Sequence, residues 1–136
     1  MKDFRSLKVW AKAHQLTLAV YKVTRAFPKD ELYGLTSQIR RAATSVPSNL
    51  AEGCGRASDP DFARFVEMAA SSALEVEYQL LLSRDLELID RARYRELQAA
   101  IVGVKQMLAS LIKTLRGTNG RRTVLAGSAA RPKAQG

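Results

Sequence analysis

The sequence predicts an all-α fold, an antiparallel four-helix bundle, from three observations. Apolar residues recur at steps of three and four along most of the 136 residues, as on one face of a helix. Residues that end helices divide this pattern into segments, with Pro28 after the first and Gly53 after the second. The connections are short, which favours antiparallel neighbours. A chain of this length is one domain, and we place the bundle in residues 1–116 and a tail in residues 117–136.

The first helix is predicted over residues 5–26, because the residue before Pro28 avoids the helical region. At about 100° per residue its apolar side chains form two separate stripes, whereas a single core needs only one. The stripe that contains Val9 and Val20 is assigned to the core. The other stripe is predicted to be a subunit interface, and a monomeric mass in solution would contradict this. It consists of Leu7, Trp10, His14, Leu18 and Tyr21.

The second helix is predicted within residues 33–56, with Asp30 as its N-cap. Pro47 lies inside this helix and lacks an N–H, so it must kink or divide the helix. We expect a kink, because the apolar steps continue in phase through the proline. Asn49 is a candidate to cap backbone groups that Pro47 leaves unpaired, and Gly53 and Gly55 supply the stop.

The third helix is predicted to open at Asp59, a cap candidate, with Pro60 where a missing N–H costs little, and to run to about Leu86. Small side chains at residues 69–73 allow the second helix to approach closely. The fourth helix is predicted to begin near Asp90, and its apolar residues alternate steps of four and three, as in a bundle helix.

The residues around the second helix also carry a resemblance to a known family. In order, they are FPKDELY, GLTSQIRRAATSVPSNLAEG and SDPDFARF. With these motifs, residues 4–115 resemble the 23S rRNA intervening-sequence protein family of four-helix-bundle proteins. The resemblance implies a homo-oligomeric ring, with a pentamer as the expected form, and no established catalytic activity. It also implies a relation to the accessory proteins of diversity-generating retroelements, which bind a reverse transcriptase and nucleic acid.

The charge balance favours an anionic partner, such as nucleic acid or a phospholipid surface. The chain has 22 Lys and Arg against 13 Asp and Glu, a formal net charge of +9. The alternative is a basic pI that reflects only solubility and the composition of the host proteome. Part of the excess lies in the tail, which contains basic residues and no acid and is predicted to be disordered.

The second helix carries a dense set of polar residues that match motif positions of the family, and two interpretations remain open for them. One is architectural, a hydrogen-bonded network between helices. The other is that guanidinium and ammonium groups contact phosphates. The architectural motif consists of Pro47, Asn49, Glu52 and Gly53. The residues assigned to nucleic-acid binding are Arg40, Arg41, Arg56, Arg64, Lys8, Lys12 and Lys22.

No catalytic residue, metal site or cofactor is predicted. His14 is the only histidine and has no carboxylate partner at helical spacing. Cys54 lies between two glycines, where its thiol is expected to be exposed, but only His14 could serve as its base. Glu75 and Glu77 diverge around a helix and cannot share a metal. Neither a Glu-x-x-His motif nor a P-loop occurs.

The sequence therefore predicts a non-enzymatic oligomeric scaffold whose basic surface binds structured RNA or DNA through backbone contacts, since base-reading motifs are missing. A protein partner such as a reverse transcriptase is a further expectation from the resemblance. The alternative is a structural or protein-interaction oligomer whose charge is incidental. A single cysteine and the lack of a long apolar run predict a cytoplasmic protein with no membrane partner.

Overall fold

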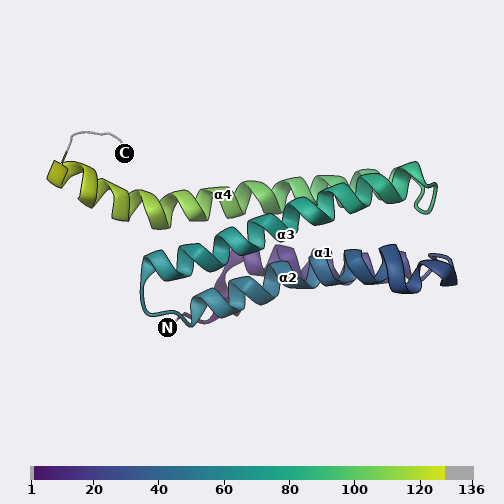
Figure 1. Cartoon of the computed structure of the whole chain (residues 1–136), viewed down its shortest axis with the longest axis horizontal. Helices are drawn as coiled ribbons and strands as arrows, with labels where there is room; N and C mark the ends of the chain where they lie inside the picture. Colours follow the sequence, from purple (N-terminus) through teal and green to yellow (C-terminus); the bar gives the residue numbers. More distant parts are fainter. Residues whose placement is uncertain (1, 128–136) are drawn as a thin grey trace.

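The computed structural model describes residues 2–127, with side chains for residues 2–117. These residues form four α-helices and no β-strand, which confirms the predicted all-α class. The helices are α1 (Lys8–Thr24), α2 (Ser37–Cys54), α3 (Asp59–Asp85) and α4 (Arg91–Gly127). Successive helices run in opposite directions, and the α2–α3 and α3–α4 turns lie at opposite ends of the bundle (Figure 1).

One face of each helix forms the core. α1 contributes the stripe predicted to face the core, in which Val9, Leu16 and Val20 are buried. α3 has extensive contacts with α2 on one side and α4 on the other, and the small side chains of Ala43 and Ala69 are buried in the same cluster. Each fully buried Val, Leu or Ile side chain stabilises the folded state by about 1.5–3 kcal/mol.

The N-terminal caps of two helices differ from the prediction. Asp30 is not the cap of the second helix: a short 3-10 helix (Lys29–Glu31) and a π-helix (Leu32–Thr36) precede α2, and Glu31 accepts a hydrogen bond from the Leu35 N–H at 3.4 Å. The cap of α3 is Ser58, one residue before the predicted Asp59, and its hydroxyl accepts from the Asp61 N–H at 3.3 Å.

Pro47 is buried within α2, which continues as one helix from Ser37 to Cys54. Because Pro47 has no N–H, the carbonyl oxygen of Ala43 loses its partner within α2. The hydroxyl of Thr17 on α1 lies 2.9 Å from this oxygen and donates to it, while also lying 3.0 Å from the Ala13 carbonyl of its own helix. Asn49 does not have the predicted capping role, because its amide donates to the Ser45 carbonyl at 2.9 Å. The neighbouring helix therefore completes the backbone of α2.

α4 is longer than predicted. We placed the end of the bundle near Gly117, but α4 continues to Gly127 and extends past the other three helices (Figure 1). Leu115 is the last buried residue on α4 within residues 2–117. Residues 128–136, the remainder of the predicted disordered tail, lie outside the described residues. None of the helices described is long and apolar enough to cross a membrane.

Candidate functional site

The residues predicted to bind nucleic acid do not form one patch. They separate into a groove between α1 and α4, the two flanks of α2, and the turn between α2 and α3. Arg40 and Arg56 are 16 positions apart on α2 and its C-terminal turn, roughly 24 Å at 1.5 Å per residue.

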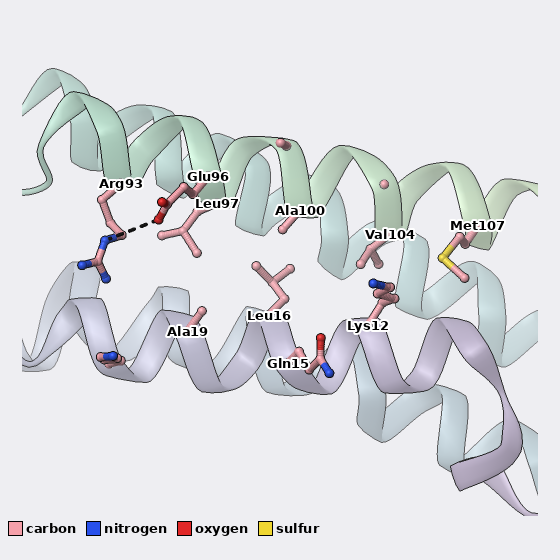
Figure 2. Close-up of a pocket in the computed structure, with 13 residues that line it drawn as sticks. Lys12, Gln15, Leu16, Ala19, Arg93, Glu96, Leu97, Ala100, Val104 and Met107 are labelled. Atoms are coloured by element: carbon pink, nitrogen blue, oxygen red, sulfur yellow. Dashed lines mark ion pairs between the residues drawn. The ribbon is translucent and has the colours of Figure 1, made fainter.

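The groove between α1 and α4 has an apolar floor and charged edges (Figure 2). Its volume is about 520 Å³, and Leu16 and Leu97 contribute to its floor. Lys12 and Lys22 line it from α1, whereas the Arg93 and Glu96 side chains of α4 form an ion pair at 3.6 Å. We call this surface the lysine groove.

Helix α1 carries uncompensated positive charge, at Lys12 and Lys22 in the lysine groove and at Lys8, which does not line the groove. No Asp or Glu occurs between Phe4 and Lys29. The exposed side chains of Lys8, Lys12 and Lys22 have no carboxylate oxygen of residues 2–117 within 4 Å. These three ammonium groups are free to attract an anion.

Arg40 ties α2 to the C-terminal end of α1. Its Nε donates to the Thr24 hydroxyl at 2.8 Å, and its guanidinium lies 4.7 Å from the centre of the Tyr21 ring. A cation is favourable at the carboxyl end of a helix, and stacking on an aromatic ring adds to the attraction. These contacts favour the architectural interpretation for Arg40.

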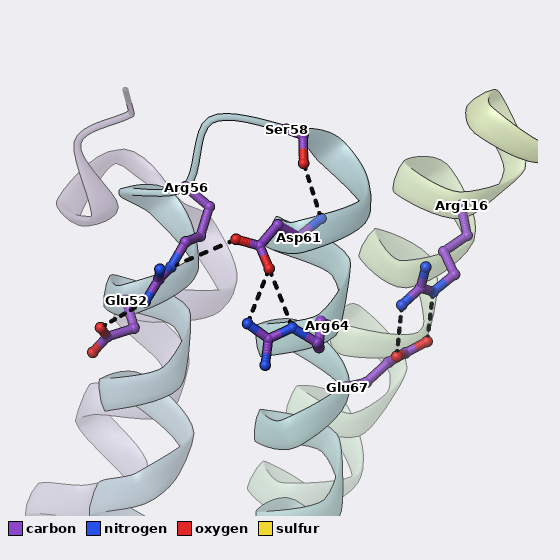
Figure 3. A network of polar contacts seen from close by, with 7 residues as sticks. All are labelled: Glu52, Arg56, Ser58, Asp61, Arg64, Glu67 and Arg116. Atoms are coloured by element: carbon purple, nitrogen blue, oxygen red, sulfur yellow. Dashed lines mark hydrogen bonds and ion pairs between the residues drawn. The ribbon is translucent and has the colours of Figure 1, made fainter.

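Arg56 and Arg64 lie at the turn between α2 and α3, in a network with carboxylates (Figure 3). Arg56 donates to Glu52 at 3.0 Å and lies 3.9 Å from Asp61, which also accepts from Arg64 at 3.0 Å. Both guanidinium groups stack on Phe65, at 4.4 and 4.6 Å. Because carboxylates neutralise and shield these arginines, they are weaker phosphate ligands than the α1 lysines.

Gly53 has an architectural role at the same end of the bundle. A Cβ atom added there would lie 2.8 Å from Cδ1 of Phe62 and 3.1 Å from Cβ of Phe65. The absence of a side chain therefore lets the C-terminal end of α2 approach the first turns of α3 closely.

The second stripe of α1 lines a shallow groove against α2, and Pro47 is among the α2 residues that line it. Trp10 stacks on His14 with ring centroids 5.0 Å apart. Leu18 is 56% exposed and Tyr21 41% exposed. We call this surface the aromatic groove. Leu7, predicted to belong with these residues, is instead half-buried against the core and does not line the groove.

Cys54 is not the exposed thiol that its neighbouring glycines suggest. It is 3% exposed, and burial raises the pKa of its thiol, although the charge of Lys2 opposes this effect. A buried, protonated thiol is a poor nucleophile. Within residues 2–127, no three His, Cys, Asp or Glu side chains are grouped so that they could hold a metal ion.

Arg41 lies on the opposite flank of α2 from Arg40, in a polar pocket between α2 and α3. Sequence reasoning missed the other polar residues of this pocket, among them Tyr33, Glu75 and Gln79. Their only signal is that Arg41 and Ser45 on α2, like Glu75 and Gln79 on α3, are four residues apart and share a helix face.

The fold and these surfaces define the class: an antiparallel four-helix bundle with open grooves, in which the described residues include no metal-binding cluster. The family model of the 23S rRNA-intervening sequence protein matches residues 5–110, and the chain belongs to this family. This confirms the family resemblance, whereas the relation to retroelement accessory proteins stays a prediction.

One solved structure similar to this chain is the crystal structure of a protein of unknown function from the S23 ribosomal protein family of Bacteroides thetaiotaomicron. The two share 27% sequence identity with a TM-score of 0.70, over 77% of this chain and 98% of the other. A comparison with curated proteins finds no match.

Proposed function

We propose that this protein is a non-enzymatic, oligomeric scaffold that binds structured RNA through its phosphate backbone. The observation that carries the proposal is the row of exposed lysines on α1, Lys8, Lys12 and Lys22, which have no carboxylate neighbour among the described side chains. Ammonium groups of this kind release counterions when they meet phosphates, which is the main source of sequence-independent affinity. The name of the family, which refers to 23S rRNA, supports RNA as the polyanion.

The oligomeric part of the proposal rests on the aromatic groove. Leu18 and Tyr21 present apolar surface to solvent beside the half-buried Trp10, and exposed apolar patches with aromatic residues are typical of protein–protein contacts. A homo-oligomeric ring, a pentamer in our proposal, would repeat the lysine row around one assembly. Repetition turns weak individual phosphate contacts into avidity.

The aromatic groove also favours a second candidate function, a protein-interaction oligomer whose charge is incidental. In that case the groove binds a further copy or a protein partner such as a reverse transcriptase, and nucleic acid plays no part. The two candidates share the same assembly but differ in their response to salt.

The test is a salt titration of binding to a labelled structured RNA and to a matched DNA duplex. The full chain is compared with a Lys8→Gln/Lys12→Gln/Lys22→Gln variant and with a charge-matched control, Arg91→Gln/Arg95→Gln/Lys113→Gln. We expect the α1 variant to flatten the slope of log K against log salt by about 2–3, close to one per phosphate contact.

A slope that changes equally in the control would place the anion contacts elsewhere on the molecule. Absence of binding at low salt would favour the protein-interaction candidate. Tighter binding to the DNA duplex than to the RNA would indicate DNA, and not RNA, as the nucleic acid that the protein binds. A chain that ends at Gly117 separates the contribution of the basic tail from that of the bundle.

A further inference from the structure

The polar pocket between α2 and α3 is built from two rows of side chains at helical spacing. The rows approach each other at one end, where the Ser72 hydroxyl donates to the Ser45 hydroxyl at 2.8 Å. Beyond this bond the helices enclose an open space of about 470 Å³. Its polar lining includes Tyr33, Arg41, Ser45, Ser72, Glu75 and Gln79.

Opposite charges line the pocket without pairing. Because α2 and α3 are antiparallel, Arg41 and Glu75 lie about one turn beyond the Ser45–Ser72 bond, on opposite walls. Within the described part of the chain, neither side chain has an ion pair or a hydrogen bond. In contrast, Glu77 on another face of α3 pairs with Lys105 at 2.6 Å.

Two further groups of the pocket have unused binding capacity. The side-chain oxygen of Gln79 is buried and has no hydrogen-bond partner among residues 2–117, which is an unfavourable state for a buried acceptor. Tyr33, on the π-helix that precedes α2, is 94% exposed and lines the same pocket. An exposed aromatic ring next to unsatisfied polar groups is the arrangement on which proteins stack unpaired bases.

The charges limit the class of ligand. A phosphate would meet the Glu75 carboxylate, which repels it, so the pocket suits a neutral group that offers both donors and an acceptor. The Watson–Crick edge of guanine has two adjacent N–H donors, N1 and N2, beside the acceptor O6. A carboxylate accepts from two such donors, and a guanidinium donates to O6. Adenine, cytosine and uracil do not present two adjacent donors.

We propose that this pocket binds an unpaired guanine base, with Glu75 accepting from N1 and N2, Arg41 donating to O6 and Tyr33 stacking on the ring. The assignment of that base to an RNA strand rests on the proposed function, whereas base recognition by the pocket does not. It adds a base-specific contact between α2 and α3 to a molecule whose α1 lysines, on another face of the bundle, can contact only phosphates.

The test measures binding of guanosine, inosine and adenosine monophosphates to the full chain by NMR titration. Inosine monophosphate lacks only the 2-amino group, so its affinity reports the contact between N2 and the carboxylate. We expect guanosine monophosphate to bind about tenfold to a hundredfold more tightly than inosine monophosphate, the range of a good bidentate base contact. Adenosine monophosphate should bind more weakly than guanosine monophosphate.

Three variants locate the effect. Glu75→Gln should abolish the preference for guanosine over inosine monophosphate. Tyr33→Ala should lower the affinity for all three nucleotides. Glu87→Gln, also an exposed glutamate without an ion pair to residues 2–117, should change nothing. Equal binding of guanosine and inosine monophosphates, no binding of guanosine monophosphate, or an unaltered preference in Glu75→Gln would overturn the proposal.

The outcome is distinguishable from failure of the scaffold function. Free nucleotides test the pocket alone, so the guanosine preference should survive in the Lys8→Gln/Lys12→Gln/Lys22→Gln variant. The same preference should appear in an RNA hairpin when a loop guanosine is replaced by inosine. Guanosine monophosphate binding without RNA binding would uphold the pocket and reject the scaffold, whereas salt-dependent RNA binding without base preference would do the reverse.

Discussion

The two flanks of α2 place neighbouring arginines in opposite situations. Arg40, on the flank that meets α1, is half-buried, donates to Thr24 and stacks on Tyr21. Arg41, on the flank that meets α3, is exposed and has no hydrogen bond or ion pair to the described residues. Successive residues on a helix diverge by about 100°, so adjacent side chains meet different neighbours. The arginine on the α1 flank therefore serves the fold, whereas the arginine on the α3 flank stays available for a ligand.

The largest effect on stability is expected where α1 meets α2, from the substitution Thr17→Val. This substitution keeps the shape of the side chain but removes the hydroxyl that donates to the Ala43 carbonyl at 2.9 Å. A buried acceptor left without a partner should lower the free energy of unfolding by about 1–3 kcal/mol, measured by urea denaturation. Thr44→Val is the control, because that exposed hydroxyl bonds, among residues 2–117, only to the Arg40 carbonyl of its own helix. Equal losses in the two variants would contradict the role given to Thr17.

The second-largest effect is expected from Arg40→Ala, which should lower the free energy of unfolding by about 1–2 kcal/mol. This substitution removes a charge-assisted hydrogen bond that is only partly screened by water. We also expect faster amide hydrogen exchange at the C-terminal end of α1, because Arg40 donates hydrogen bonds to Thr24 and Tyr21 there. Hydrogen exchange measured by NMR checks this local effect. If amide exchange became faster to the same extent throughout the bundle, Arg40 would not stabilise the C-terminal end of α1 specifically.

A smaller effect on stability is expected when the ion pair of Glu67 is lost. Glu67 lies on α3, as Glu75 does, but unlike Glu75 it has an ion pair among residues 2–117. Arg116 of α4 donates to its two carboxylate oxygens at 2.7 and 2.8 Å (Figure 3). This bidentate bond lowers the pKa of Glu67, so its stabilisation is complete above the ordinary glutamate pKa and is lost as the pH falls through the lowered value. The pair is largely solvent-exposed, so the loss should be about 0.2–1 kcal/mol.

The measurement is urea denaturation of the wild type and the Arg116→Gln variant between about pH 6 and pH 3, on either side of the ordinary glutamate pKa. Arg116→Gln should reduce the pH dependence by the contribution of Glu67. An identical pH profile in the variant would show that the pair does not affect stability.

Arg41→Ala should have the smallest effect on folding, within about 0.5 kcal/mol, because an exposed side chain without partners contributes little to stability. The same variant should lose affinity for guanosine monophosphate. A marked loss of stability would break the comparison, since it would show that Arg41 serves the fold as Arg40 does.

Most of the fold was predictable because helix periodicity is a local property of the sequence. The core stripe of α1 and the beginning of α4 follow from spacing and capping, with Asp90 accepting from the Arg93 N–H at 2.8 Å. The error at Asp30 arises because a 3-10 helix and a π-helix precede α2, so that α2 begins only at Ser37. The error at Asp59 arises because the adjacent Ser58 offers an equally good cap oxygen. Small differences in loop geometry decide between such neighbours.

The candidate site was less predictable, because it depends on the register between helices. The spacing of Arg41 and Ser45 identifies a row on α2, but only the position of Ser45 opposite Ser72 aligns that row with Glu75. Likewise, nothing local distinguishes Arg40 from Arg41, and the glycines around Cys54 suggested exposure where tertiary packing buries the thiol. Register and packing are properties of helix pairs, which single-helix periodicity does not describe.

The hydroxyl of Thr17 also sets an order of events during synthesis. Since chains are made from the amino terminus, α1 and its donor are synthesised before the Pro47 segment that needs them. When α2 emerges, the incomplete turn around Ala43 can close onto the α1 segment that precedes it. The proline therefore couples the completion of α2 to docking on α1, so that the first two helices should become protected as one cooperative unit.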